Sequence, residues 1–347
     1  QELLRDYGAE IVVLGARFWA SRVEYNPELD CYEIRNVIGP DEYKEHVDNN
    51  YYTNFLVQQH LLFAAALSAD PVCSPILEGW DITELEAEQW NAVAEKIRLP
   101  RQDDLFEQFD GFLELNEIDV LKFRDTPGAL QKAYSWREIN RAQVLKQADV
   151  IMLFHLFYDR FTMSEKRANW DFYEPKTMHD SSLSAAMHSV VASDLGLSSE
   201  AYAYFEKASR IDLGNALMNS AHGLHAASLG GLWQAVIHGF AGVRVKNQVL
   251  SLIPRLPETW AGLKFSLQLG KSLVRVEITH ETASVSLVGV DRPARVDERV
   301  KADERIQVGE PVKAGQPVTV GQSIEVQVGS ETFILDESMG SVTVAYR

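Results

Sequence analysis

The segment TNFLVQQHLLFAAALSA, residues 53–69, decides the fold class of the first part of the chain. It joins bulky apolar side chains to a run of alanines, which is typical of a buried helix. It ends at Asp70-Pro71, where proline cannot continue a helix. We therefore expect one long helix from Thr53 to Ala69.

Comparable patterns recur on both sides of this segment. Apolar residues at helical spacing predict further helices over residues 1–20, 84–97, 137–157, 180–194, 198–209 and 232–240. The side chain of Asp180 or Ser181 is expected to cap the helix that runs to Asp194. Because short polar loops join these helices, the pattern predicts an α/α assembly whose loops gather at one end.

The pattern of apolar residues changes near Val243, from helical spacing to short alternating runs. Beyond it, short alternating runs at 265–269, 273–278 and 284–287 are separated by turn residues and predict strands. Residues 252–257 carry two prolines and read as a connector, since each proline holds its predecessor in an extended conformation. We therefore expect a mainly α fold, divided into a helical domain over residues 1–245 and a strand-rich domain over residues 246–347.

Composition limits the class of protein and its partners. The 347 residues contain 46% hydrophobic and 24% charged residues, as in an ordinary globular protein, and their net charge of −17 disfavours nucleic acid and anionic membranes. The two cysteines, Cys31 and Cys73, cannot form a disulfide framework and fit a cytoplasmic protein. No apolar stretch reaches the length of a membrane span. The chain begins without Met, in what reads as the middle of a helix, and we expect a fragment or a processed chain.

The loop at residues 36–50 is the first candidate for chemistry. An expected strand over residues 31–38 leads into it, and Gly39-Pro40 breaks regular structure before Glu42. Glu42 is the candidate proton donor, because nearby tyrosines would partly desolvate its carboxyl group. The polar and aromatic run at residues 47–54 is of the kind that hydrogen-bonds a polyol. The alternative is a solvated turn that leads into a helix.

Two loops at helix starts form the second candidate. The runs His179-Asp180-Ser181-Ser182 and His225-Ala226-Ala227-Ser228 combine hydroxyl and imidazole groups with the unpaired N–H groups of a helix terminus, which suits phosphate. Each run is also readable as an ordinary cap. A serine hydrolase is disfavoured because no Gly-x-Ser-x-Gly elbow is present. No metal-ligand spacing and no phosphate-cradling Gly-x-x-x-x-Gly-Lys motif occurs, and Lys146 and Asp149 are expected to share a helix face.

Several of these motifs, taken in order, resemble glycoside hydrolase family 65. They are Val37-Ile38-Gly39-Pro40-Asp41-Glu42-Tyr43, Val47-Asp48-Asn49-Asn50, Tyr52-Thr53-Asn54, Lys146-Gln147-Ala148-Asp149, His179-Asp180-Ser181-Ser182-Leu183-Ser184, Gly223-Leu224-His225 and Gly231-Leu232-Trp233. Within the family the chain looks like the inverting disaccharide phosphorylases that act on maltose, kojibiose, nigerose or trehalose. The resemblance covers nearly all of residues 1–260 and implies an (α/α)6 barrel followed by a small β-sandwich domain.

The resemblance also implies a role for individual residues. Glu42 would be the general acid, and Lys146 and Gln147 would bind the glucosyl hydroxyls. Ser181, Ser182 and His225 would bind inorganic phosphate, a co-substrate that attacks the anomeric carbon with inversion to give β-glucose 1-phosphate. No cofactor is expected. Phosphate is already an anionic nucleophile, so no second carboxylate is needed to activate water, and this favours phosphorolysis over hydrolysis.

The chain departs from the family pattern in its extent. Family members look about twice as long, and the Trp-Asp motif expected upstream of the acid has no counterpart except Trp170-Asp171, which comes too late. The chain therefore resembles a C-terminal half, and its expected partner is the missing N-terminal half, in an enzyme that is a homodimer when complete. We expect the chain alone to turn over poorly. An inverting α-glucosidase or trehalase of the same fold, and a non-catalytic sugar-binding remnant, stay open as alternatives.

Overall fold

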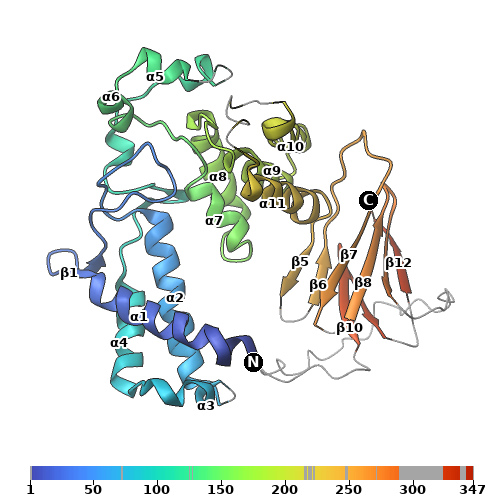
Figure 1. Ribbon diagram of the computed structural model, residues 1–347, viewed down its shortest axis with the longest axis horizontal. Helices are drawn as coiled ribbons and strands as arrows, with labels where there is room; N and C mark the ends of the chain where they lie inside the picture. The colour runs from blue at the N-terminus through green and yellow to red at the C-terminus, as the bar shows by residue number, and fades with distance from the viewer. Residues whose placement is uncertain are drawn as a thin grey trace.

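A computed structural model describes residues 2–71, 73–124, 126, 128–214, 217, 221, 223–246, 249–270, 272–288, 323–336 and 341–346. Helices form the larger part of the molecule, and the two four-stranded sheets lie beside them at one end (Figure 1). The α-helices are α1 Ala9–Arg22, α2 Tyr51–Ala69, α3 Ser74–Leu77, α4 Glu84–Lys96, α5 Ala129–Ala133, α6 Trp136–Asn140, α7 Val150–Leu156, α8 Met163–Tyr173, α9 Ser184–Asp194, α10 Ser198–Leu213 and α11 Ala226–Gln234. Single π-helical turns precede α1, at Leu4–Gly8, and follow α11, at Ala235–Phe240.

Two large apolar cores and a smaller third one, which includes Tyr43, Leu130 and Met178, hold the helical part together. One core joins α1, α2 and α4 and includes Val13, Leu61 and Trp90. The other joins the start of α2 to α7, α8, α9 and α10 and is rich in aromatic rings. The predicted helix from Thr53 to Ala69 is confirmed as α2. It starts two residues earlier, where the Asn50 side chain accepts a hydrogen bond from the Thr53 amide at 2.9 Å and caps it.

The helix predicted over residues 137–157 is wrong. The structure has the short helices α6 and α7 there, and residues 141–149 between them are not helical. Their backbone groups form hydrogen bonds with distant segments instead. The Gln143 amide donates to the Asn116 carbonyl oxygen, and the Leu145 amide donates to the Lys176 carbonyl oxygen. Buried backbone groups need partners, and here tertiary partners replace those of a helix. Lys146 and Asp149 therefore do not share a helix face.

Three other predicted boundaries also differ. The strand predicted at 31–38 is limited to β2, Cys31–Glu33, paired with β1, Glu24–Asn26. Helix α9 starts at Ser184, and neither Asp180 nor Ser181 caps it, because its first turn follows Leu183 with no side-chain cap. The helix predicted at 232–240 begins earlier, at Ala226. Its Gly231 lets α11 approach α9 closely, since a Cβ there would lie 2.8 Å from that of Ala186.

The strand-rich part is a β-sandwich. One sheet has the order β11-β10-β6-β5 and the other the order β12-β9-β8-β7. Their bounds are β5 Arg244–Lys246, β6 Val249–Leu252, β7 Leu263–Leu269, β8 Ser272–Ile278, β9 Thr282–Leu287, β10 Ile324–Val328, β11 Glu331–Leu335 and β12 Ser341–Ala345. Alternate residues of both sheets share one apolar core. The three strands predicted from the alternating runs are confirmed as β7, β8 and β9.

Partly buried polar contacts attach the sandwich to the helices. Arg244, at the start of β5, donates to the Asp194 carboxylate of α9 at 2.7 Å. Arg255 donates to the Ser193 carbonyl oxygen at 2.6 Å. β5 begins next to the boundary that we predict at residue 245, and the division of the chain into two domains at that residue stays a prediction.

Among the described residues, no single helix has both the length and the apolar character needed to cross a membrane. Residues Tyr51–Ala69 and Ser74–Trp80 satisfy the criteria of length and composition only as a pair, and they meet at 105°.

Candidate active site

The loop that carries Glu42 docks on the segment Lys146–Asp149. Asp41, which is fully buried, accepts hydrogen bonds from the backbone amides of Lys146 at 2.8 Å and Tyr43 at 3.2 Å. The Asp41 amide in turn donates to the Asp149 carboxylate at 3.2 Å. These contacts join two motifs that are more than a hundred residues apart in the sequence and fix the backbone on both sides of Glu42.

Asp149 and Asp41 share a buried polar cluster. The amide group of Gln108 donates to Asp41 at 3.1 Å and to Asp149 at 3.5 Å, and Asn50 donates to Asp149 at 3.3 Å. Burial, and then the charge of Asp41, raise the pKa of Asp149 to about 8. Burial also raises the pKa of Asp41. The cluster therefore favours a protonated Asp149 over two buried carboxylate charges.

Lys44 supplies a buried positive charge below the same loop. Its ammonium group donates to the carbonyl oxygens of Ile139 at 2.7 Å and Ala142 at 2.6 Å. Burial lowers the pKa of Lys44 to about 8, although the charge of Asp41 opposes that shift. The loop is thus held at Asp41 and at Lys44, and Glu42 lies between these two buried residues.

Glu42 itself is accessible. Its side chain is 59% exposed and forms an ion pair with the ammonium group of Lys146. The side-chain amide of Gln147 donates to the Pro40 carbonyl oxygen in the same loop. The structure therefore brings Glu42, Lys146 and Gln147 together, and leaves the Glu42 carboxylate where a ligand can reach it.

The serine-bearing loop lies against the same segment. The Asp180 amide donates to the Lys146 carbonyl oxygen at 3.1 Å, and the Asp180 carboxylate accepts a hydrogen bond from the Tyr43 hydroxyl at 2.7 Å. Ser181 accepts a hydrogen bond from the Leu183 amide at 3.3 Å. The half-buried Ser182 hydroxyl has no hydrogen-bond partner within the described ranges.

A buried network supports this loop from below. His179 contacts the Ser184 hydroxyl at 2.8 Å and the Tyr204 hydroxyl at 3.1 Å, and Tyr204 donates to Glu174. His179 has a positive φ of 58°, which few side chains adopt, so the network holds a strained turn directly before Asp180. Burial lowers the pKa of His179 well below its usual value, and His179 is therefore neutral near pH 7.

His225 lies at the start of α11, as the sequence suggested. Its Nδ1 lies 2.6 Å from an Asp212 carboxylate oxygen, and its amide donates to the other oxygen of that carboxylate at 3.0 Å. Helix α11 packs on α9 through Gly231 and Ala186, but no hydrogen bond between described residues joins His225 to Ser181 or Ser182. The roles of Ser181, Ser182 and His225 stay predictions.

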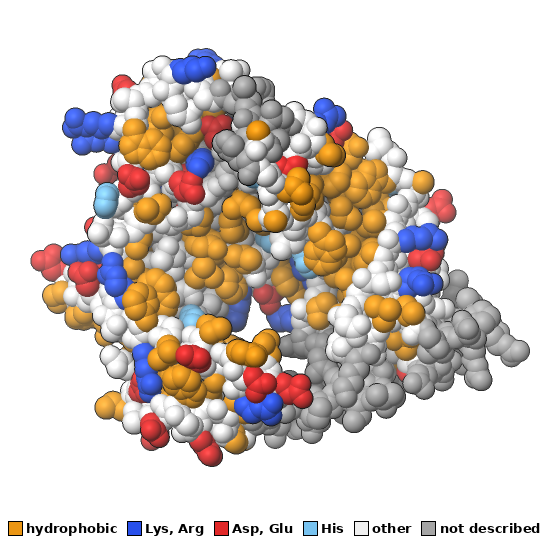
Figure 2. Space-filling view, viewed as in Figure 1, with side chains coloured by type: hydrophobic (Ala, Val, Ile, Leu, Met, Phe, Trp, Pro, Cys, Tyr) orange, Lys and Arg blue, Asp and Glu red, His pale blue; other side chains and the backbone are white. Residues whose placement is uncertain are grey.

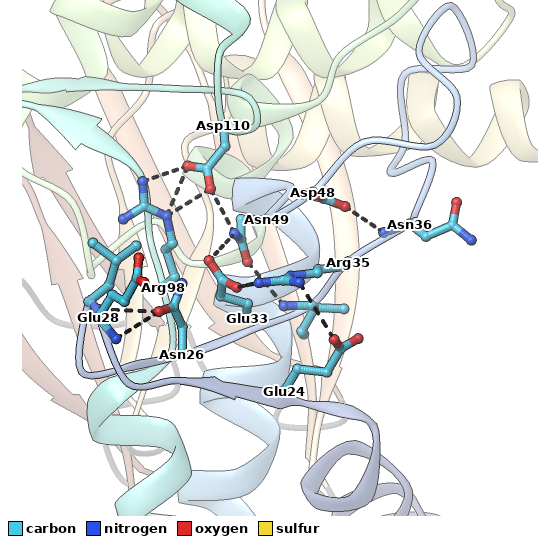
Figure 3. A network of polar contacts seen from close by, with 12 residues as sticks. Glu24, Asn26, Glu28, Glu33, Arg35, Asn36, Asp48, Asn49, Arg98 and Asp110 are labelled. Carbon is cyan, nitrogen blue, oxygen red and sulfur yellow. Dashed lines mark hydrogen bonds and ion pairs between the residues drawn. The ribbon is translucent and has the colours of Figure 1, made fainter.

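The three asparagines of the polar run at residues 47–54 are structural, whereas Asp48 in the same run is exposed. Asn49, Asn50 and Asn54 are all buried. Asn49 donates to Asp110 at 2.7 Å and accepts from the Ile34 amide at 3.0 Å, and Figure 3 shows this network where β2 ends. These side chains hold the strand end against the start of α2, so the prediction that this run binds a polyol is wrong for the three asparagines.

Sequence reasoning missed several residues that build the site. Gln108 lies in the loop after Phe106 and donates to Asp41 at 3.1 Å, and Gln131, on α5, donates to Asp180 at 3.2 Å. Asp41 directly precedes Glu42 and Lys44 lies two residues after it, but nothing in the sequence pattern marks these two residues as buried. Within the described ranges, no group of three or more His, Cys, Asp or Glu residues could hold a metal ion.

Fold and site together define a class of protein: a helical part joined to a β-sandwich, with a carboxylate, a lysine and a serine-bearing loop brought together in the helical part. Residues 1–234 match the family model of the glycosyl hydrolase family 65 central catalytic domain, and residues 243–299 match that of the family's C-terminal domain. The chain belongs to glycosyl hydrolase family 65. The predicted family and fold class are confirmed.

Curated relatives support the assignment to this family. A kojibiose phosphorylase of Halothermothrix orenii is 47% identical over 84% of this chain and 38% of its own length. A maltose phosphorylase of Bacillus subtilis is 36% identical over 82% of this chain and 38% of its length. A solved structure described as a kojibiose phosphorylase from human microbiome superposes with a TM-score of 0.82 at 25% identity, over 100% of this chain and 47% of that one. The chain thus spans well under half the length of the two curated relatives.

Proposed function

We propose that this chain is the C-terminal part of an inverting disaccharide phosphorylase. The complete enzyme transfers the glucosyl group of an α-glucosidic disaccharide to inorganic phosphate, and releases β-glucose 1-phosphate and a free sugar or polyol. The observation that carries the proposal is the docking of the Glu42 loop and the serine-bearing loop on one segment, Lys146–Asp149. Named relatives that are phosphorylases of kojibiose, maltose and trehalose support it.

In this proposal, Glu42 protonates the glycosidic oxygen as the bond to the anomeric carbon breaks. A phosphate oxygen forms the new bond from the opposite face, which inverts the configuration. The ion pair between Lys146 and Glu42 weakens when Glu42 takes up the proton that it donates to the sugar, because a neutral carboxyl group no longer attracts the ammonium group of Lys146 by its charge. A glucosyl hydroxyl then accepts a hydrogen bond from the ammonium group of Lys146, and Gln147 lies beside it. Ser181, Ser182 and His225 hold phosphate.

Asp180 favours phosphorolysis over hydrolysis. An inverting hydrolase needs a second carboxylate that activates water. Asp180 is the carboxylate of the serine-bearing loop, and it already accepts hydrogen bonds from Tyr43 at 2.7 Å and Gln131 at 3.2 Å. A carboxylate that is occupied in this way is a poor general base. A phosphate ion needs no such base, because it arrives as an anion and requires only positioning.

The proposed partner is the part of the family fold that precedes this chain. Helix α1 and the π-helical turn before it expose a row of large apolar side chains at helical spacing, between 47% and 74% exposed: Leu3, Tyr7, Ile11, Leu14 and Phe18. Figure 2 also shows hydrophobic side chains gathered around a hollow in the centre of the face in view. Exposed apolar rows of this kind mark surfaces that another element covers. The missing barrel helices are the proposed occupant.

Three further properties of the complete enzyme are proposals. It is cytoplasmic and homodimeric, and it needs no cofactor besides the co-substrate phosphate. The free thiols of Cys31 and Cys73 are compatible with a reducing compartment, and the homodimer rests on the family resemblance alone. Light scattering of the purified full-length enzyme tests the oligomeric state.

An activity assay of the full-length enzyme tests the proposed reaction. Kojibiose, maltose and trehalose are offered with and without phosphate, and the product and its anomeric form are followed by proton NMR. We expect β-glucose 1-phosphate only when phosphate is present, and a loss of at least about a hundredfold in kcat in Glu42→Gln. Release of free glucose without phosphate would show a hydrolase instead. Binding of sugar without turnover would show a sugar-binding remnant.

A further inference from the structure

Tyr43 joins the two loops of the candidate site. It directly follows Glu42 and is only 2% exposed. Its hydroxyl donates to the Asp180 carboxylate at 2.7 Å across 137 residues of sequence. Asp180 directly precedes Ser181. One hydrogen bond therefore links the residue after the proposed proton donor to the residue before the proposed phosphate ligands.

Other contacts fix this hydrogen bond. Gln131 donates to the Asp180 carboxylate at 3.2 Å and also contacts the Tyr43 hydroxyl. The Trp136 ring packs edge-on against the Tyr43 ring, with 5.8 Å between the ring centres. On the other side, the Asp180 amide donates to the Lys146 carbonyl oxygen at 3.1 Å. We name the set Tyr43, Gln131 and Asp180 the clasp.

We propose that the clasp is a positioning device that sets the separation between Glu42 and the phosphate bound by Ser181 and Ser182. This inference rests on the proposed function. Inversion places the proton donor and the nucleophile on opposite faces of the same anomeric carbon, so both loops must keep a fixed spacing. A displacement of about 1 Å can lower a rate by about a hundredfold. None of the three clasp side chains needs to touch the substrate for this purpose.

The chemistry of Tyr43 suits a permanent link. Burial, and then the hydrogen bond with Asp180, raise the pKa of the Tyr43 hydroxyl, so the hydroxyl keeps its proton and remains a donor near neutral pH. Hydrogen bonds to a charged acceptor are stronger than those between neutral groups. The link is therefore expected to hold throughout turnover.

A second buried tyrosine provides a matched control. Tyr173 is fully buried, and its hydroxyl donates to the carbonyl oxygen of Phe106, a residue of neither loop. Tyr43→Phe and Tyr173→Phe each remove one hydroxyl and one buried hydrogen bond. Both variants should lose some stability, but only Tyr43→Phe should change the KM for phosphate and kcat.

The test uses steady-state kinetics of the full-length enzyme and its thermal midpoint. In Tyr43→Phe we expect the KM for phosphate to rise about tenfold and kcat to fall by about tenfold or more, with the KM for the disaccharide changed less than about twofold. Tyr173→Phe should leave all three constants near those of wild type. Asp180→Asn can still accept from Tyr43 through its amide oxygen, so it should keep more phosphate affinity than Asp180→Ala. Tyr43→Phe and Asp180→Ala should be non-additive when combined.

The outcomes separate this inference from the proposed function. If wild type shows no phosphate-dependent product, the proposed function fails and the clasp inference fails with it. If wild type is a phosphorylase but Tyr43→Phe changes only the thermal midpoint, as Tyr173→Phe does, the clasp is a structural contact and the inference alone is overturned. Additive effects of Tyr43→Phe and Asp180→Ala would overturn it in the same way.

Discussion

Replacement of Asp149 by asparagine tests the buried carboxylate cluster under the Glu42 loop. Asp149 is fully buried, and its pKa of about 8 lies far above the roughly 3.9 of an unfolded Asp. Between these two values the folded protein keeps the proton and the unfolded chain has lost it. Unfolding therefore releases a proton, and a rise in pH favours the unfolded state. The stability that this proton confers is complete below about pH 4 and is lost by about pH 8.

The size of the effect follows from the slope of this linkage. Each pH unit inside the window lowers the free energy of unfolding by about 1.4 kcal/mol, so wild type should lose about 3 kcal/mol between pH 5 and pH 7 through Asp149. The amide introduced by Asp149→Asn cannot titrate. Its oxygen can still accept from Asp41 and Asn50, so we expect a cost of only about 1 kcal/mol at pH 5. At pH 7 the variant should equal or exceed wild type in stability.

Urea unfolding at pH 5, 6 and 7 measures the difference in the free energy of unfolding between wild type and Asp149→Asn. All other titrating groups are common to the two proteins, so their contributions cancel in this difference. Asp171→Asn is the control for the chemical change, because the Asp171 side chain is 56% exposed in an ion pair on a helix surface. Parallel curves of free energy against pH for wild type and Asp149→Asn would refute the reasoning. They would show that Asp149 is ionised in the folded protein already at pH 5.

Three further predictions concern the site, the domain contact and the exposed row on α1. Lys146→Met removes a charged donor to the sugar and should lower kcat/KM for the disaccharide about tenfold to a hundredfold in steady-state assays, while the thermal midpoint changes little. Arg244→Met removes the partner at 2.7 Å from the half-buried Asp194 carboxylate and leaves it only Lys166 at 3.8 Å, so it should lower the free energy of urea unfolding by about 2 kcal/mol. Arg167→Met, in an exposed pair, should cost less than about 1 kcal/mol. Ile11→Glu should destabilise the full-length enzyme by about 2 kcal/mol or more, because the preceding helices are proposed to cover the Ile11 side chain there. The stability of the 347-residue chain should not change, since Ile11 is exposed in it. Equal shifts of the thermal midpoint in both proteins would count against a covered α1.

The sequence marked the main elements and motifs of this chain through local patterns. The apolar run at residues 53–69 and the alternating runs after residue 263 indicated a helix and strands, because their periods match one face of each element. The motifs around Glu42, Lys146 and Ser181 were recognisable as short strings of chemistry-bearing residues. Their order along the chain was enough to indicate the family, and the family model confirms it.

The tertiary structure alone decided how those motifs meet. Residues 141–149 look helical by composition but pair with distant backbone, because buried N–H and C=O groups accept any well-placed partner and local propensity is weak beside that requirement. The same applies to Asp41, Asp149 and the hydrogen bond from Tyr43 to Asp180, whose burial depends on which segments pack together. The sequence by itself determined the elements and the reactive groups. Packing over long sequence separations decided which groups are buried, which are charged and which face one another.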